Sequence, residues 1–101
     1  IIDLMGKVEI QSNSTLSHRV ILNTHTNAGK SPLKNEHLKT TQGDIIIGSG
    51  TYVGIGVMIL ENVEVGENTI IGALSLVNRS IPPNSKAYGL PCRVQETLND
   101  N

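Results

Sequence analysis

Along the second half of the chain, an aliphatic residue recurs at every sixth position. This row consists of Ile47, Val53, Ile59, Val65, Ile71 and Val77. Four residues after each member comes a small or branched side chain: Thr51, Val57, Val63, Thr69, Ser75 and Ile81. A helical heptad or a simple strand alternation does not have this period. The pattern predicts a solenoid of short strands in which three six-residue units complete one triangular coil.

Glycine follows the aliphatic residue at four of the six units, as Gly48, Gly54, Gly66 and Gly72. Because glycine adopts positive φ angles at little cost, we expect these glycines to form the tight corners of the coil. The aliphatic side chains are expected to point into the prism. The small residues four places on are expected to lie where neighbouring faces converge.

A weaker set of repeats precedes this one and is out of phase with it, at Leu4, Ile10, Leu16 and Leu22. Between the two sets lies a polar stretch without the pattern, which indicates a functional loop. After Val77, Pro82-Pro83 is expected to end strand pairing. The chain therefore predicts a single domain with repeats over 4–26, a loop over 27–43, repeats over 45–81, a closing segment over 82–95 and a polar tail over 96–101.

Composition agrees with a solenoid, because the 101 residues include ten Gly, two Tyr and no Phe or Trp. The net charge of −1 and the lack of a basic run argue against nucleic acid or a membrane as partner. One cysteine excludes an intramolecular disulfide, and no secretory signal is visible, so we expect a cytoplasmic protein. Because the chain opens on Ile1, we expect its natural start to lie upstream.

Two closing motifs carry a resemblance to a known family: Ser80-Ile81-Pro82-Pro83-Asn84-Ser85 and Gly89-Leu90-Pro91-Cys92-Arg93-Val94. Together with the repeats, the chain resembles the hexapeptide-repeat O-acetyltransferases, most of all the galactoside, maltose and capsular-sugar branch. The resemblance extends back through Thr24-His25-Thr26-Asn27. It implies an all-β, left-handed parallel β-helix that forms a homotrimer, with active sites between subunits. It also implies acetyl-CoA as the acyl donor, a small-molecule acceptor and no metal.

The resemblance makes His25 the catalytic general base. Acetyl transfer to an alcohol needs a base whose pKa lies near neutrality, within hydrogen-bond reach of the hydroxyl. His18 and His37 are the alternative candidates for this base. Three histidines also suggest the zinc site of the γ-type carbonic anhydrases, which share the fold. Their spacing in this chain does not reproduce that ligand set, so no metal site is predicted.

The resemblance also assigns cofactor contacts. Ile55 and Ala73 correspond to residues beside the pantetheine arm, and Asn78-Arg79 corresponds to a Thr-Lys pair near the end of the repeats. Arg93 corresponds to a basic residue that faces the nucleotide phosphates, which a guanidinium fork suits. Tyr52 stands where the family usually has Trp, near the acceptor, so it is the candidate for substrate binding.

Two departures from the family pattern bear on activity. Leu74 replaces a glycine and would crowd the cofactor groove, whereas Glu61-Asn62 replaces a Pro-Gly corner in which Asn can form a left-handed turn. The leading hypothesis is an acetyl-CoA-dependent O-acetyltransferase that acts on a hydroxyl of a sugar or sugar-like acceptor. A non-catalytic trimeric scaffold is the alternative, and xenobiotic or serine O-acetylation remains open within the enzyme class.

Overall fold

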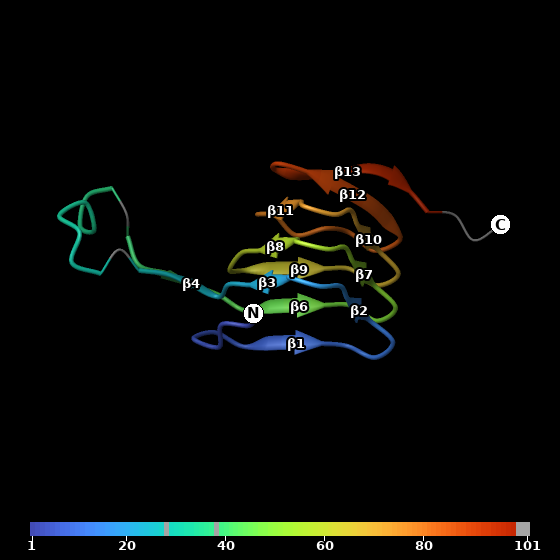
Figure 1. The fold of residues 1–101 in the computed structure, drawn as a ribbon, viewed down its shortest axis with the longest axis horizontal. Helices are drawn as coiled ribbons and strands as arrows, with labels where there is room; N and C mark the ends of the chain where they lie inside the picture. Colours follow the sequence, from blue (N-terminus) through green and yellow to red (C-terminus); the bar gives the residue numbers. More distant parts are fainter. Residues whose placement is uncertain (28, 38, 99–101) are drawn as a thin grey trace.

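A computed structural model describes residues 1–27, 29–37 and 39–98 as an all-strand protein (Figure 1). The strands are β1 Val8–Ile10, β2 Thr15–Leu16, β3 Ile21–Leu22, β4 His25–Thr26, β5 Thr41–Gln42, β6 Ile45–Ile47, β7 Tyr52–Val53, β8 Met58–Ile59, β9 Val63–Val65, β10 Ile70–Ile71, β11 Leu76–Val77, β12 Ser85–Gly89 and β13 Cys92–Thr97. Within these ranges no helix is long and apolar enough to cross a membrane.

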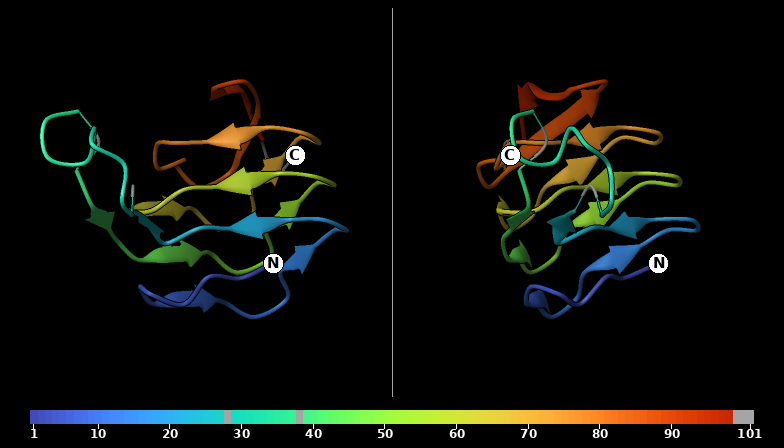
Figure 2. Two further views of the ribbon diagram at one scale, coloured as in Figure 1. Left: turned by 60° about the vertical axis from the view of Figure 1, so that its left-hand side comes forward. Right: turned by 90° about the vertical axis from the view of Figure 1, so that its left-hand side faces the viewer.

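The strands stack into the three faces of a prism, and the fold is the predicted left-handed parallel β-helix (Figure 2). We call the face of β1, β6 and β9 the first face. The second face contains β2, β7, β10 and β12, with β13 added antiparallel at its end, and the third face contains β3, β8 and β11. We call the edge between the second and third faces the 2–3 edge, and the edge between the third and first faces the 3–1 edge.

The predicted six-residue period is confirmed by the strand register. Ile47 pairs with Val65, 18 positions later, and Val53 pairs with Ile71 at the same interval. All four side chains are fully buried, so three units of six complete one coil. The predicted small residues four places on are also buried: Thr51, Val57, Val63, Thr69, Ser75 and Ile81.

The two repeat sets are out of phase in the sequence but aligned in space. Ile10 pairs with Ile47 and Leu16 pairs with Val53, which continues the same rows through the early coils, although Ile10 in the first coil is 41% exposed. Ile10 and Ile47 are 37 positions apart, although one coil takes 18. The difference of 19 residues is an insertion that leaves the prism between β3 and β6, as Figure 1 shows.

The prediction that Leu4 belongs to the inward row is wrong, because its side chain is 72% exposed. Ile2 instead forms the bridge to Leu22. These two residues are 20 positions apart, so the first coil is two residues longer than the later ones. The extra residues form a bend at Met5 and Gly6, and Leu4 is turned outward beside it.

The prediction that the glycines after the aliphatic residues supply positive φ angles is also wrong. Positive φ occurs two residues further on, at Gly50 (φ 69°) and Gly56 (φ 71°). The aligned corners of other coils hold non-glycine residues at positive φ: Asn13, Arg19, Asn68, Leu74 and Asn84. Asn62 has positive φ in a corner of the 3–1 edge. The coil therefore imposes this conformation on whatever residue occupies the corner, at some conformational cost for an L-residue.

The glycines after the aliphatic residues serve a different purpose, which is close approach between coils. A Cβ atom on Gly48 would lie 2.5 Å from the backbone nitrogen of Glu67 in the next coil. On Gly66 it would lie 2.3 Å from the nitrogen of Pro83. Only glycine leaves room for the next coil at these positions.

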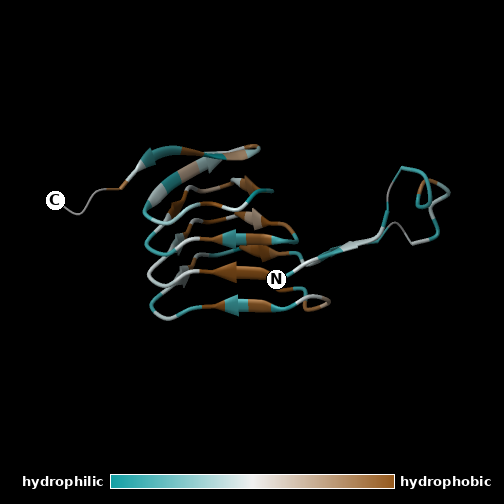
Figure 3. Cartoon of the chain, turned by 180° about the vertical axis from the view of Figure 1, so that it is seen from behind, coloured by the Kyte–Doolittle hydropathy of each residue, from teal (hydrophilic) through white to brown (hydrophobic). Residues whose placement is uncertain are grey.

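Strand pairing continues past Pro82-Pro83, contrary to expectation. Ile71 pairs with Ala87 of β12, and β13 returns antiparallel with Glu96 and Thr97 included, which the sequence had placed in the polar tail. The prolines lie between the second and first faces, before β12 begins, so they remove no ladder hydrogen bond. Figure 3 shows the hydropathy of each strand, and β6 is hydrophobic along its whole length.

Substituting Gly48→Ala tests the close approach between coils. The added methyl group meets the Glu67 backbone, so we expect a loss of about 1–3 kcal/mol in the free energy of unfolding. Ser49→Ala, in the same corner, should stay within about 0.5 kcal/mol of wild type. Urea denaturation of the three proteins provides the measurement. Equal midpoints for Gly48→Ala and wild type would contradict the packing described.

Candidate functional site

The inserted segment is an arm that projects from the prism and is two-stranded at its base. Strands β4 and β5 pair antiparallel, with His25 opposite Gln42 and Thr26 opposite Thr41. Figures 1 and 3 both show the arm extending away from the coils. The predicted loop thus begins at a short ladder of two residue pairs, and His25 is the first residue of that ladder.

His25 is paired with a carboxylate from the first coil. Its Nδ1 lies 2.5 Å from Oδ2 of Asp3, and the His25 side chain is 32% exposed. The backbone nitrogen of Thr24 donates to the same oxygen at 3.0 Å, and the Thr24 hydroxyl donates to it at 3.1 Å. The backbone nitrogen of Met5 donates to the other oxygen of Asp3. The carboxylate is therefore held in place from several sides.

These contacts affect the ionisation of Asp3 and the position of the proton that it shares with His25. Partial burial of Asp3 opposes ionisation, but hydrogen bonds from His25, Thr24 and Met5 outweigh it and lower the pKa of the carboxyl group below its ordinary value. An ionised carboxylate only accepts hydrogen bonds, so Nδ1 of His25 carries the proton that it donates to Asp3. In the neutral imidazole Nε2 therefore carries the lone pair, and the described residues form no hydrogen bond with it.

A second carboxylate, from Glu61, lies at the base of the arm. Its Oε2 accepts hydrogen bonds from the hydroxyl of Thr26 at 2.9 Å and from that of Thr41 at 2.5 Å. Burial of Glu61 favours its neutral form, but the hydrogen bonds from Thr41 and Thr26 and the attraction of His25 lower its pKa overall. Two ionised carboxylates thus flank the arm at the point where His25 leaves the prism.

Two of the predicted cofactor residues lie on a different edge of the prism from His25. Ile55 and Ala73 are exposed on the 2–3 edge, where the backbone of Leu74 donates to the Ile55 carbonyl. His25 and Glu61 lie at the 3–1 edge. Residues 55 and 61 are six apart along an extended face, which spans roughly 20 Å.

Tyr52 occupies the second face, where its hydroxyl lies 2.9 Å from the Ser17 hydroxyl. Asn78 and Arg93 are brought together, because a guanidinium nitrogen of Arg93 donates to the Asn78 side-chain oxygen at 2.9 Å. Arg79, next to Asn78, is exposed. Within one copy of the chain, the predicted site residues therefore lie on the 2–3 edge, the 3–1 edge, the second face and the antiparallel pair of β12 and β13.

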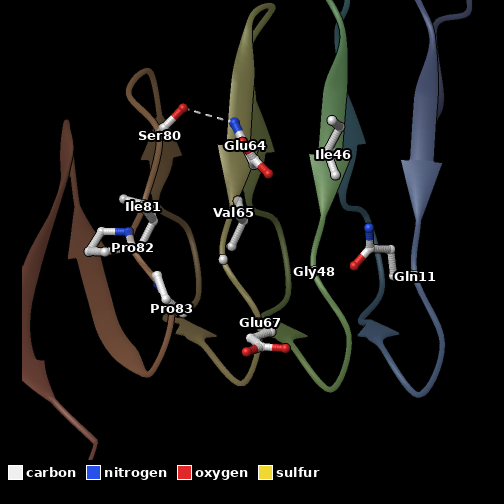
Figure 4. A pocket seen from close by; sticks show the side chains of 11 residues that line it. Gln11, Ile46, Gly48, Glu64, Val65, Glu67, Ser80, Ile81, Pro82 and Pro83 are labelled. Atoms are coloured by element: carbon white, nitrogen blue, oxygen red, sulfur yellow. Dashed lines mark hydrogen bonds between the residues drawn. The ribbon is translucent and has the colours of Figure 1, made fainter.

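An open groove of about 620 Å³ lies along the first face, apart from all of these residues (Figure 4). Its lining consists of Gln11, Ile46, Gly48, Glu64, Val65, Gly66, Glu67, Ser80, Ile81, Pro82 and Pro83. None of the predicted catalytic, cofactor or substrate residues contributes to it.

Sequence reasoning missed Asp3 altogether and treated Glu61 only as a departure from the family corner. Asp3 lies 22 positions before His25, which is close to the 20 residues of the first coil, so the two residues lie near each other in the stack. A coil of 18 residues would instead place Asp3 beside residue 21, which is four positions before His25. The two extra residues of the first coil hid this signal.

Other reactive groups in the described part of the chain are accounted for by packing. His, Cys, Asp and Glu residues there form no group of three or more that could hold a metal ion. Cys92 is fully buried in the core, and burial raises the pKa of its thiol. This position is typical of a cysteine that packs in the core.

The lowered pKa of Asp3 predicts how stability depends on pH. Because the folded pKa lies below the ordinary value of 3.8, the carboxylate stabilises the fold above that pH. This contribution is lost as the pH falls through the folded pKa. Urea midpoints measured between about pH 6 and pH 2 should therefore fall more for wild type than for Asp3→Asn, which cannot titrate. A constant difference between the two proteins across this range would contradict the ionised pair.

Comparison with known proteins gives the family context. The sequence profile described as bacterial transferase hexapeptide (six repeats) matches residues 44–79. A galactoside O-acetyltransferase from Escherichia coli (strain K12) is 46% identical over 56 residues, which is 55% of this chain and 28% of that protein.

Two solved structures extend the comparison over nearly the whole chain. A galactoside acetyltransferase in complex with coenzyme A has a TM-score of 0.84 and 33% identity, with 98% of this chain and 49% of that chain covered. A maltose O-acetyltransferase from Clostridium difficile 630 has a TM-score of 0.81 and 34% identity, with 93% and 50% covered. The chain thus spans about half the length of these two solved chains. It is a hexapeptide-repeat β-helix, and the predicted resemblance to the galactoside and maltose O-acetyltransferases is confirmed.

Proposed function

We propose that this protein is an acetyl-CoA-dependent O-acetyltransferase that acts on a hydroxyl of a sugar or sugar-like acceptor. The observation that carries the proposal is the Asp3–His25 pair at the base of the arm. It provides an imidazole with one nitrogen anchored and the other available, which is what a general base requires. The similarity to sugar O-acetyltransferases supplies the reaction class, and the use of acetyl-CoA fits a cytoplasmic protein.

In the proposed mechanism, Nε2 of His25 removes the proton of the acceptor hydroxyl while the oxygen of that hydroxyl attacks the thioester carbonyl of acetyl-CoA. The tetrahedral intermediate collapses to the acetyl ester and expels the thiolate of CoA, which receives the proton from His25. Asp3 is a positioning residue, because it fixes the tautomer and stabilises the imidazolium that forms transiently. No covalent enzyme intermediate and no metal takes part.

The cofactor contacts remain those that the resemblance implies. The pantetheine arm would lie along the 2–3 edge beside Ile55 and Ala73, where a small side chain at position 73 permits close approach. Asn78, Arg79 and Arg93 would face the nucleotide end, and the Asn78–Arg93 hydrogen bond supports a shared role for these two. Tyr52 would contact the acceptor near the thioester.

The separation of these residues favours an assembly of several copies. His25 and the Ile55–Ala73 edge lie roughly 20 Å apart in one chain, which is too far for a base and a thioester to react. Placing the 3–1 edge of one copy beside the 2–3 edge of another would bring them together. A homotrimer with three such clefts satisfies this requirement with a closed ring.

The first test of the base is His25→Ala. Loss of a general base should reduce the rate of thiol release from acetyl-CoA by about 10²–10⁴-fold with galactosides, maltose or glucose as acceptors. His37→Ala is the matched control, because it removes an exposed histidine from the same arm and should leave the rate unchanged. Equal rates for His25→Ala and wild type would exclude His25 as the base.

The shared site predicts complementation between two inactive variants. His25→Ala removes the base, and Ala73→Trp blocks the cofactor edge, so neither protein should be active alone. When the two are unfolded together and refolded as a mixture, some clefts combine an intact His25 with an intact Ala73. Activity recovered only in the mixture is the expected result. A mixture as inactive as its components would argue that both residues act within one chain.

A non-catalytic trimeric scaffold is the second candidate, and Leu74 is the observation that favours it. Its side chain is 68% exposed beside Ala73, where a cofactor would lie. Calorimetric titration with CoA separates the two functions. Binding that Leu74→Gly strengthens would support an enzyme with a narrowed groove, whereas a folded protein that binds no CoA in either form would support the scaffold.

A further inference from the structure

The geometry points to Glu61 as a second positioning residue, one that holds the arm, and with it His25, against the prism. The catalytic part of this inference rests on the proposed function, whereas the structural part does not. Glu61 lies in the corner after β8, where the family pattern that the chain resembles has proline. A proline side chain accepts no hydrogen bond, so this contact is a feature of this chain.

One oxygen of Glu61 connects both strands of the arm to the coil. Oε2 accepts from Thr26 on β4 and from Thr41 on β5, and these two threonines are opposite each other in the ladder. The ladder consists of only two residue pairs, and a hairpin of this size is marginal in water by itself. A contact that bridges its two strands at the base therefore adds a restraint that the ladder lacks.

The charge of Glu61 makes this restraint strong. Hydrogen bonds to an ionised carboxylate are shorter and about twice as strong as those between neutral groups. The hydroxyl of Thr41 donates one such hydrogen bond to Oε2. The other hydrogen bond comes from Thr26, the residue next to His25, so the restraint acts one residue from the proposed base.

The negative charge of Glu61 also interacts with His25. His25 becomes a cation when it takes the proton of the acceptor, and its Nδ1 is already bonded to Asp3. The charge of Glu61 attracts the same imidazolium without a direct hydrogen bond. Glu61 thus contributes two separable features, namely the hydrogen bonds that hold the arm and a negative charge near the proposed base.

Three variants separate these effects. Glu61→Ala removes both the hydrogen bonds and the charge. Glu61→Gln keeps an amide oxygen that can accept from both threonines but carries no charge. Glu64→Ala is the control, because it removes an exposed carboxylate from the neighbouring strand β9 that does not contact the arm.

The first readout is amide hydrogen exchange, which does not depend on activity. In Glu61→Ala, exchange in residues 25–27 and 39–42 should rise by roughly tenfold or more, while exchange in the coils stays as in wild type. Glu61→Gln should restore protection, and Glu64→Ala should match wild type. Unchanged exchange in Glu61→Ala would overturn the inference. If that variant does not fold, unchanged protection in the double variant Thr26→Val/Thr41→Val, which removes both donors, would overturn it equally.

The second readout is steady-state kinetics with acetyl-CoA. A positioning role predicts that kcat falls by about tenfold or more in Glu61→Ala while KM for acetyl-CoA is unchanged, with partial recovery in Glu61→Gln. A looser arm with an unaltered kcat would overturn the catalytic part. If wild type itself shows no turnover, the proposed function fails, and the exchange data still decide whether Glu61 holds the arm.

Discussion

The structure depends on the distance between successive coils. Glycines at the start of four corners let the backbone of the next coil approach where a methyl group would collide, as at Gly48 and Gly66. This contact keeps the parallel ladders in register, with Ile47 on Val65 and Val53 on Ile71. A fold without Phe or Trp can then be stable, because each coil covers the aliphatic row of its neighbour.

The same rigid stack explains how a short chain can present a chemical site. The prism provides fixed edges, and the 19-residue insertion places an arm on one of them without disturbing the rows on either side. The anchors of that arm come from coils far apart in the sequence, with Asp3 in the first coil and Glu61 after β8. Both hold side chains at the base of the arm, where the ladder begins. The position of His25 therefore depends on the base of the arm and not on its tip.

The sequence was sufficient for the repeat and the fold class, because a period of six and a closing motif are local patterns, whereas the role of His25 stays a prediction. It was not sufficient for the partners of His25. Asp3 reaches it only because the first coil has two extra residues, and nothing in the neighbourhood of Asp3 indicates that length. The corners at Arg19 and Leu74 were missed for a related reason. Their positive φ is imposed by the coil and is not signalled by residue type.

A crystal structure of the protein with coenzyme A would test the central claim most directly. The account predicts an assembly in which the sulfur of CoA lies within roughly 4 Å of Nε2 of His25 from one subunit. The pantetheine arm should follow the Ile55–Ala73 edge of the neighbouring subunit. Coenzyme A bound instead in the groove of the first face, or far from every His25, would contradict the account.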